Sequence, residues 1–111
     1  MKKILFVCSA NKQRSKTASD YFSEKFPSIA FDSAGTNHKI CHKEGTQPLT
    51  ESLMHWADSV LVMEEKHKRI ITENGGSHFR KKIAVLSIPD RYTYYQKELI
   101  GLLESKAELL F

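Results

Sequence analysis

Cysteine is scarce in this chain, and that scarcity excludes one class of protein. Two cysteines among 111 residues are too few for the disulfide framework of a small secreted domain. We therefore expect a reducing compartment, the cytoplasm, in which Cys8 stays a free thiol. The three prolines and five glycines are spread along the chain, and neither repeats nor linker-like stretches interrupt it. Residues 1–111 are thus predicted to form a single domain.

Long hydrophobic runs are missing as well. No stretch approaches the length of about 20 apolar residues that a membrane-spanning helix needs. Lys2 and Lys3 precede a short apolar run, as in a signal peptide, but polar residues follow too soon for a signal region. We therefore expect a soluble protein that has no membrane partner.

Charge of one sign is not concentrated in any segment. The net charge is +4, yet the lysines are scattered and glutamates interrupt them. No basic stripe with interleaved aromatic residues appears, so the charge indicates a mixed, solvated surface rather than a nucleic-acid partner. With 41% hydrophobic residues, the chain has enough apolar side chains to form a core without disulfides or metals.

Strand and helix patterns alternate along the chain. Apolar runs predict strands at residues 4–7, 28–33, 59–63 and 83–88, and amphipathic patterns predict helices at 15–26, 49–57, 64–73 and 94–110. The segment 34–47 contains glycines and mixed polar residues and is predicted to be a loop. Strands that alternate with helices pair in parallel through right-handed crossovers. We therefore predict an α/β fold with three α/β/α layers around a four-stranded parallel sheet.

Helical spacing also predicts which apolar side chains are buried. In the helix at 49–57, with Thr50 as its N-cap, we expect Leu49, Leu53 and Trp56 to face the core. The last helix carries an apolar stripe made of Leu99, Leu102, Leu103, Leu109 and Leu110.

The most informative segment runs from Cys8 to Ser15 and reads Cys-Ser-Ala-Asn-Lys-Gln-Arg-Ser. It follows a buried strand and opens a helix, which is where anions bind in open α/β sheets. A tight loop in this position aims successive backbone amides at an anion, and the helix adds its free N–H groups and its positive dipole end. Arg14 is expected to bind two oxygens of a phosphate at once, which a lysine cannot do.

Cys8 stands at the start of this loop and is the candidate nucleophile. The loop amides and Arg14 favour its thiolate form, which can attack phosphorus in line and form a phosphocysteine that water later hydrolyses. Ser15 is expected to donate a hydrogen bond to the sulfur, to cap the helix, or both. Asn11 is expected to hold a left-handed backbone conformation. A buried, structural Cys8 is the alternative interpretation.

Asp90, after the fourth predicted strand, is the candidate acid. The parallel sheet would bring it to the same edge as Cys8, although 82 positions separate them. A phosphate dianion nearby favours the protonated carboxyl, which can give its proton to a leaving alkoxide or phenoxide and later take one from water. An aspartate after a proline is also common in turns.

The motifs VCSANKQRS and IPDRYTYY resemble the low-molecular-weight protein tyrosine phosphatases. Segments at 32–36, 47–50 and 57–65 match this family in the same order, so the resemblance spans nearly the whole chain. It implies the phosphotyrosine phosphatase I-like, flavodoxin-like topology, with Cys8 as nucleophile, Arg14 as phosphate ligand and Asp90 as general acid. It further implies a substrate and phosphate site formed by Ser9, Ala10, Asn11, Lys12, Gln13, Arg14 and Ser15, with Tyr92 at its mouth.

Several positions depart from the pattern of that family. Ala10 and Gln13 stand where the family has a glycine and a second cysteine, and Lys16 and Arg91 stand where it has prolines. The segment at 36–47 is shorter than in the family. The loop is also similar to that of related phosphatases that act on the C-terminal tail of RNA polymerase.

Other residues leave alternatives open. Cys41 is either a redox partner of the nucleophile or a bystander. His38, Cys41 and His42 lack a fourth ligand, so neither a metal nor another cofactor is expected. Tyr94 and Tyr95 either extend an aromatic rim for an aryl phosphate or begin the last helix. No role is assigned to His55, His67 and His78.

Together these residues predict a cysteine-dependent protein tyrosine phosphatase, a phosphoric monoester hydrolase. Its expected partners are a phosphorylated protein or a small phosphate ester, and inorganic phosphate. An arsenate reductase on the same fold is a second hypothesis, for which Cys41 would supply the additional thiol. A non-catalytic phosphate-binding module is a third, although binding alone needs neither Cys8 nor Asp90.

Overall fold

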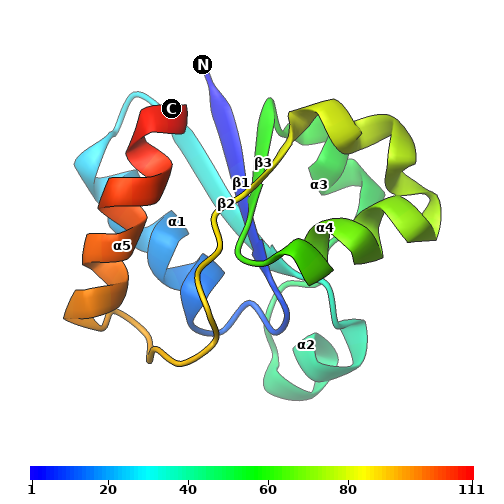
Figure 1. Ribbon diagram of the computed structural model, residues 1–111, viewed down its shortest axis with the longest axis horizontal. Coiled ribbons are helices and arrows are strands. Elements are labelled where there is room, and N and C mark those ends of the chain that lie inside the picture. The colour runs from blue at the N-terminus through cyan, green and yellow to red at the C-terminus, as the bar shows by residue number, and fades with distance from the viewer.

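A strand of apolar residues forms the centre of the protein. The computed structural model describes residues 1–111, and Figure 1 shows the sheet between two layers of helices. The strands are β1 (Lys3–Cys8), β2 (Ala30–Gly35), β3 (Ser59–Val62) and β4 (Ile83–Val85). They pair in the order β2-β1-β3-β4, and every pairing is parallel. The predicted four-stranded parallel sheet is confirmed.

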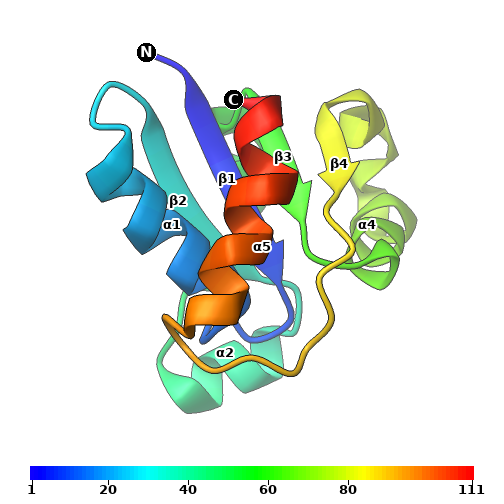
Figure 2. The ribbon, with the colours of Figure 1, turned by 60° about the vertical axis from the view of Figure 1, so that its left-hand side comes forward.

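Helices cover both faces of this sheet, which confirms the three predicted layers. α1 (Arg14–Lys25) and α5 (Lys97–Ala107) lie on one face, and α3 (Glu51–Trp56) and α4 (Glu65–Ile71) lie on the other (Figures 1 and 2). The remaining helical segments are α2 (His38–Glu44), the π-helical turn η1 (Thr72–Gly76) and the 3₁₀ turns η2 (Ser77–Lys82) and η3 (Glu108–Leu110). None of these helices has the length and apolar character that crossing a membrane requires.

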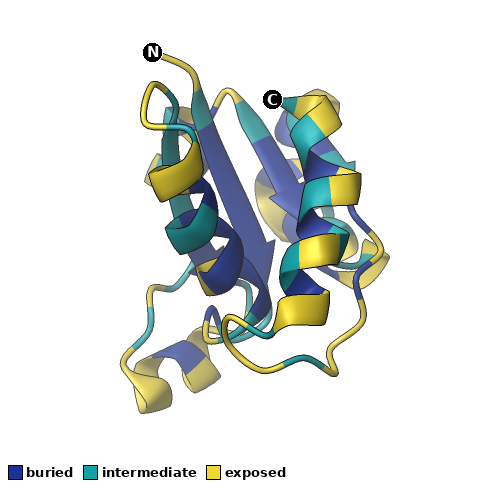
Figure 3. Cartoon of the chain, turned by 90° about the vertical axis from the view of Figure 1, so that its left-hand side faces the viewer, coloured by how far each residue is buried: buried dark blue, intermediate teal, exposed yellow.

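β1 buries side chains on both of its faces. Ile4, Phe6 and Cys8 belong to the core that α1 and α5 cover, and Leu5 and Val7 belong to the core under α3 and α4. Successive side chains of a strand point to opposite faces, so an unbroken apolar run requires cover on both sides. Figure 3 shows the matching pattern on the helices, which are buried on their inner sides and exposed on their outer sides. Cys8 is thus the last residue of a buried row.

The strand order creates a crevice at the carboxyl ends of β1 and β3. β1 connects through α1 to β2, whereas its neighbour β3 connects through α4 to β4 at the opposite edge of the sheet. Connections that leave neighbouring strands toward opposite faces open a crevice where ligands bind. Residues 8–15 lead from the end of β1 through this crevice into α1, and the turn at residues 63–67, which includes the start of α4, follows β3.

The prediction that residues 34–47 form a loop is wrong, because α2 lies within them. The Asn37 side chain accepts a hydrogen bond from the Ile40 amide and caps the helix, and Gly45 ends it with a left-handed φ of 71°. Only Cys41 of α2 is buried, so no hydrophobic period marks this helix in the sequence. The N-cap residue Asn37 and the C-cap residue Gly45 were the features of the sequence that could have predicted α2.

Thr50 caps α3 as predicted, but the inward side chains differ. Its hydroxyl oxygen accepts a hydrogen bond from the Leu53 amide. Met54 is the buried residue of α3, whereas Leu49, Leu53 and Trp56 are half-buried and pack against the edge of that core.

The last predicted helix and strand are both shorter than expected. α5 begins at Lys97 rather than at residue 94. Leu109 is 88% exposed and Leu110 is 42% exposed, because the chain tightens into the 3₁₀ turn η3 and Ala107 takes the buried position instead. β4 ends at Val85, and the left-handed Ser87 (φ 56°) interrupts the predicted strand at 83–88.

Candidate active site

The 8–15 loop presents backbone amides that the protein itself does not use. Asn11 has a φ of 51°, the left-handed conformation expected from the sequence. No carbonyl or side chain of the protein accepts a hydrogen bond from the amides of residues 9–15, and Gln13 precedes α1 without a side-chain cap. Amides in a loop with a left-handed residue at a helix N-terminus form a site for an anion.

The sulfur of Cys8 lies in a short relay of hydrogen bonds. Ser15 Oγ is 2.9 Å from Cys8 Sγ and donates its hydrogen to Asn11 Oδ1 at 2.7 Å. In this direction the relay suits a thiol, since Cys8 must then donate to Ser15. A half-turn of the Asn11 carboxamide would let its NH₂ group donate to Ser15, which could then donate to a thiolate. The expected capping role of Ser15 is wrong, because Gln13 occupies the N-cap position.

Arg14 is buried, with 2% of its side chain exposed, and one nitrogen of its guanidinium makes both of its hydrogen bonds to the protein. Nη1 donates to the Glu64 carboxylate and, at 2.8 Å, to the carbonyl oxygen of Ile88. Neither Nε nor Nη2 donates to a protein acceptor. Arg14 therefore keeps N–H groups on two nitrogens with which it can bind two oxygens of an anion.

Glu64 stays ionised beside this arginine. Partial burial acts to raise the pKa of its carboxyl group, but the hydrogen bond from Arg14 and the positive charge of that residue outweigh the burial and lower the pKa. The Glu64 carboxylate thus compensates the charge of the buried guanidinium and fixes its orientation.

Asp90 reaches the same place from the far end of the sheet. Its Oδ1 atom lies 3.7 Å from Arg14 Nε, and 61% of its side chain is exposed. Figure 2 shows the long segment between β4 and α5 passing the carboxyl ends of the strands. The two segments that the sequence separates by 82 positions therefore meet, and Arg14 of the 8–15 loop is the residue in contact with Asp90.

The turn after β3 adds His67, a residue to which the sequence assigned no role. Its side chain is fully buried; Nδ1 accepts a hydrogen bond from the Glu64 amide at 3.0 Å, and Nε2 lies 2.9 Å from Ser9 Oγ. Burial and the nearby charge of Arg14 lower the pKa of His67 to about 4, so the imidazole is neutral at physiological pH.

Solved structures resemble this chain over nearly its whole length. A YwlE arginine phosphatase mutant, whose active-site serine replaces a cysteine and is phosphorylated, is 26% identical, with a TM-score of 0.72 over 97% of this chain and 95% of that chain. The tyrosine phosphatase Wzb from Escherichia coli K30, in complex with phosphate, is 23% identical, with a TM-score of 0.77 over 98% and 95%.

The low-molecular-weight protein tyrosine phosphatase SP-PTP from Streptococcus pyogenes is 17% identical, with a TM-score of 0.72 over 95% of this chain and 85% of that chain. No family model matches the sequence, and no curated protein does. The fold, the residues of the 8–15 loop and these likenesses agree. The chain has the fold of the low-molecular-weight protein tyrosine phosphatases and resembles them over nearly its whole length.

The remaining predicted residues of the 8–15 loop are not buried: Ala10, Lys12 and Gln13. Lys12 is exposed and pairs with Glu44 at 3.4 Å, and Gln13 is half-buried without a side-chain hydrogen bond. The carbonyl oxygen of Ala10 accepts a hydrogen bond from the Thr46 hydroxyl. The segment 36–47 therefore supports the loop from outside, through α2 and the residues that follow it.

Tyr92 and its neighbours lie on the α1 side of the site. Tyr92 is half-buried against the core under α1 and α5. Its expected place at the mouth of the phosphate site stays a prediction. Tyr94 donates a hydrogen bond to Asp20 at 2.6 Å, which raises its pKa to about 12, and the Tyr95 amide donates to Thr17 Oγ1 at 2.9 Å. Neither Tyr94 nor Tyr95 begins α5, so that alternative is wrong; both anchor the segment to α1.

Cys41 lies beneath the 8–15 loop, inside α2. It is buried, and its sulfur is 3.5 Å from the carbonyl oxygen of Ala10 and 3.8 Å from that of Ser9. A Cβ atom on Gly35 would come within 2.5 Å of both the Cys41 sulfur and the Ser9 carbonyl oxygen, so only glycine fits there. Cys8 and Cys41 are both free thiols.

The possible metal ligands of the 36–47 segment do not converge. His38 bonds to the carbonyl oxygen of Leu49, and His42 is exposed while Cys41 is buried. One other group brings three possible ligand atoms within 4.8 Å of one another: Glu51, His55 and His78. All three are exposed on α3 and η2, outside the 8–15 loop.

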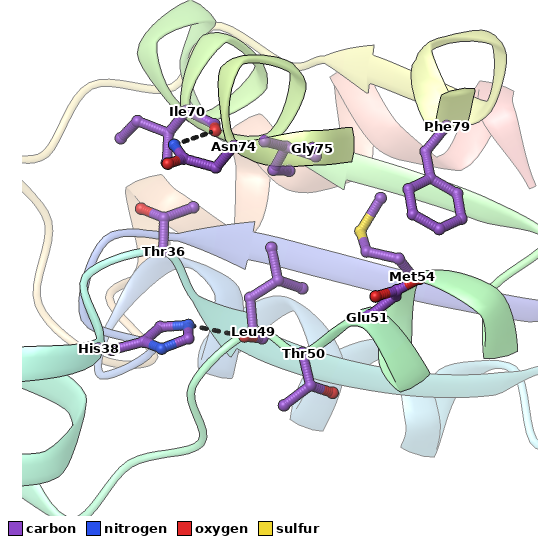
Figure 4. A pocket seen from close by; sticks show the side chains of 11 residues that line it. Thr36, His38, Leu49, Thr50, Glu51, Met54, Ile70, Asn74, Gly75 and Phe79 are labelled. Carbon is purple, nitrogen blue, oxygen red and sulfur yellow. Dashed lines mark hydrogen bonds between the residues drawn. The ribbon is translucent and has the colours of Figure 1, made fainter. Parts of the chain in front are cut away.

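A cavity of about 390 Å³ lies on the face of the sheet that α3 and α4 cover, between α3 and the end of α4 (Figure 4). Figure 4 shows Thr36 and His38 at one end and Met54 and Phe79 at the other. The Thr36 amide donates to the carbonyl oxygen of Cys8, so this end adjoins the 8–15 loop. None of the lining residues belongs to the loop itself.

Proposed function

We propose that this protein is a cysteine-dependent phosphatase that hydrolyses phosphate monoesters through a phosphocysteine intermediate. The observation that carries the proposal is the set of unused donors next to Cys8: the amides of residues 9–15 and two nitrogens of Arg14. A phosphoryl group is the common dianion whose oxygens such a ring of donors can satisfy. The names of the similar structures, which are tyrosine and arginine phosphatases, support the same reaction class.

In the first step the Cys8 thiolate attacks the phosphorus atom of the bound ester. The S–P bond forms as the P–O bond to the leaving group breaks, and the loop amides and Arg14 stabilise the charge on the non-bridging oxygens. Asp90, in its protonated form, gives its proton to the leaving oxygen. The exposed position of Asp90, beside Arg14 Nε, suits an acid that meets the leaving group at the solvent side of the loop.

In the second step water attacks the phosphocysteine. Asp90 takes a proton from that water, the S–P bond breaks, and inorganic phosphate leaves with the thiolate restored. Ser15 is positioned to donate to the departing sulfur once the Asn11 carboxamide has turned over, because its Oγ atom already lies 2.9 Å from Cys8 Sγ.

The proposed substrate is phosphotyrosine in a protein, or another aryl phosphate. Aromatic side chains at 92, 94 and 95 follow Asp90 directly in the sequence, where an aryl leaving group would lie. Tyr94 and Tyr95 are 47% and 38% exposed and so present ring surface to a ligand. One of the similar structures is named a tyrosine phosphatase and contains phosphate.

The direct test is turnover of p-nitrophenyl phosphate by the purified protein in EDTA, where the chelator silences contaminating metal-dependent phosphatases. We expect turnover, and we expect a rapid acid quench to trap one phosphoryl group on Cys8. Phosphate binding without turnover would instead favour the binding module. Thiol-dependent arsenate reduction that needs Cys41 would favour the reductase.

Asp90→Asn is expected to slow hydrolysis in proportion to the basicity of the leaving group. An amide cannot supply a proton, so phenyl phosphate should lose about 10²- to 10³-fold in kcat/KM, while p-nitrophenyl phosphate, whose phenoxide leaves unprotonated more easily, should lose much less. The measurement is kcat/KM for a series of substituted phenyl phosphates. Glu73→Gln, at an exposed carboxylate outside the site, is the control. Equal losses across the series would show that Asp90 is not the acid.

A further inference from the structure

His67 is a buried histidine in contact with the 8–15 loop, and the proposed reaction does not require it. It is fully buried in the turn after β3, and its Nε2 atom meets the hydroxyl of Ser9, the residue after the nucleophile. Ser9 directly follows β1, and His67 lies in the first turn of α4, just after β3; β1 and β3 are neighbouring strands whose carboxyl ends form the crevice. The contact is therefore placed by the topology of the sheet and not by an exposed loop.

The hydrogen-bond partners of His67 fix which of its nitrogens carries the proton. Nδ1 accepts a hydrogen bond from the Glu64 amide, so this nitrogen holds no hydrogen. In a neutral imidazole the hydrogen then sits on Nε2, which donates it to Ser9 Oγ at 2.9 Å. The Ser9 oxygen is thus an acceptor in this contact.

The hydroxyl hydrogen of Ser9 consequently has no acceptor in the contact with His67. A serine hydroxyl is one donor, and no protein atom accepts a hydrogen bond from Ser9 Oγ apart from the His67 contact. Ser9 is only half-buried, and it stands next to Cys8, between the sulfur and the run of unused amides. Its free hydrogen is available to an oxyanion held over Cys8.

We propose that the Ser9 hydroxyl is a ligand of the bound phosphoryl group and that His67 is the residue that positions it. This inference rests on the proposed function for its substrate, and it adds a donor beyond the backbone and Arg14. Glu64 contacts Arg14, and His67 contacts Ser9. The turn at residues 63–67 therefore orients one side chain at each end of the anion-binding segment.

A purely structural role for His67 makes a different prediction. His67 also caps the start of α4: its Nδ1 accepts a hydrogen bond from the Glu64 amide, and its own amide donates to the Glu64 carbonyl oxygen. If capping were its only role, any residue that accepts from the Glu64 amide would replace it. If His67 also positions Ser9, the replacement must reach Ser9 with a donor as well.

Two variants at position 67 separate these roles. Asparagine in His67→Asn can accept from the Glu64 amide but is too short to reach Ser9. Glutamine in His67→Gln can accept with its oxygen and extend its NH₂ group toward Ser9. Ser9→Ala removes the hydroxyl, and His42→Asn, at an exposed histidine of α2, is the control.

The readouts are the dissociation constant of inorganic phosphate, measured by calorimetry, and kcat and KM for p-nitrophenyl phosphate, with melting temperature recorded for each variant. We expect Ser9→Ala and His67→Asn each to weaken phosphate binding about tenfold, the typical effect of one hydrogen bond to a charged group. The double variant should lose no more than either single one, and His67→Gln should recover most of the affinity lost in His67→Asn.

Three results would overturn the inference: phosphate affinity unchanged in Ser9→Ala, losses that add in the double variant, or equal affinities for His67→Asn and His67→Gln. Because calorimetry measures phosphate binding without turnover, it separates a failure of this inference from a failure of the proposed function. A wild-type protein that binds phosphate without turning over an ester would defeat the phosphatase proposal, and the variants would still decide the roles of Ser9 and His67.

Discussion

Cys8→Ser is expected to abolish turnover of p-nitrophenyl phosphate, with a loss of at least about 10⁴-fold in kcat. Serine keeps the size and the hydrogen-bond contact with Ser15, but a hydroxyl is not ionised at neutral pH and is a poor nucleophile in this site. Phosphate binding should survive, because the loop amides and Arg14 are untouched. The measurement combines steady-state turnover with the affinity for inorganic phosphate.

Cys41→Ser is the matched control for this substitution. Cys41 is also a buried free thiol close to the loop, but it contacts the carbonyl oxygens of Ser9 and Ala10 from beneath. We expect the Cys41 variant to retain turnover of the ester. Substantial activity in Cys8→Ser, or loss of activity only in Cys41→Ser, would show that the nucleophile has been misassigned.

Arg14→Lys is expected to produce the second-largest loss, about 10²- to 10⁴-fold in kcat/KM. The guanidinium uses Nη1 for Glu64 and the Ile88 carbonyl and leaves two nitrogens for the phosphoryl oxygens. A lysine ammonium has a single nitrogen and cannot serve the carboxylate and two anion oxygens in that geometry. The charge stays the same, so the loss measures the geometry of the group and not its sign.

The control for this variant is Arg69→Lys, at an exposed arginine of α4. Melting temperatures of both variants are needed, because Arg14 is buried and its replacement also alters the partner of Glu64. We expect Arg14→Lys to weaken phosphate binding and turnover beyond any change in stability. Turnover within about threefold of the wild type would contradict the assigned role.

Much of the fold could be predicted from the sequence because its elements carry strong local patterns. The apolar run of β1 requires cover on both faces, and the alternation of strands with helices requires parallel pairing. α2 was missed for the opposite reason: one buried residue, Cys41, leaves no period to detect. The exposure of Leu109 and Leu110 was missed because the change from α-helix to 3₁₀ turn shifts the side-chain spacing.

The residues of the candidate site were likewise predicted only in part. Cys8, Asn11, Arg14 and Ser15 lie within one short stretch of chain, so their spacing by itself predicts an anion site. Glu64 and His67 could not be assigned, because their contacts with Arg14 and Ser9 exist only once β3 is placed beside β1.

Only a weak sequence pattern could have pointed to Glu64 and His67. An acidic residue followed three positions later by a polar side chain marks a helix start, and here that helix start lies at the end of a strand, where ligands bind. The neighbour of the 8–15 loop in the crevice is therefore the turn after β3, while the segment with Asp90 reaches in from β4.

The central claim is that Cys8 is the nucleophile at the base of an anion site, and its alkylation by iodoacetate, with and without inorganic phosphate, tests this directly. In the wild-type protein we expect iodoacetate to modify Cys8 and to leave Cys41 unmodified, and we expect inorganic phosphate to suppress the reaction. Modification of Cys41 in preference to Cys8, or a rate of Cys8 modification that inorganic phosphate does not change, would contradict the account.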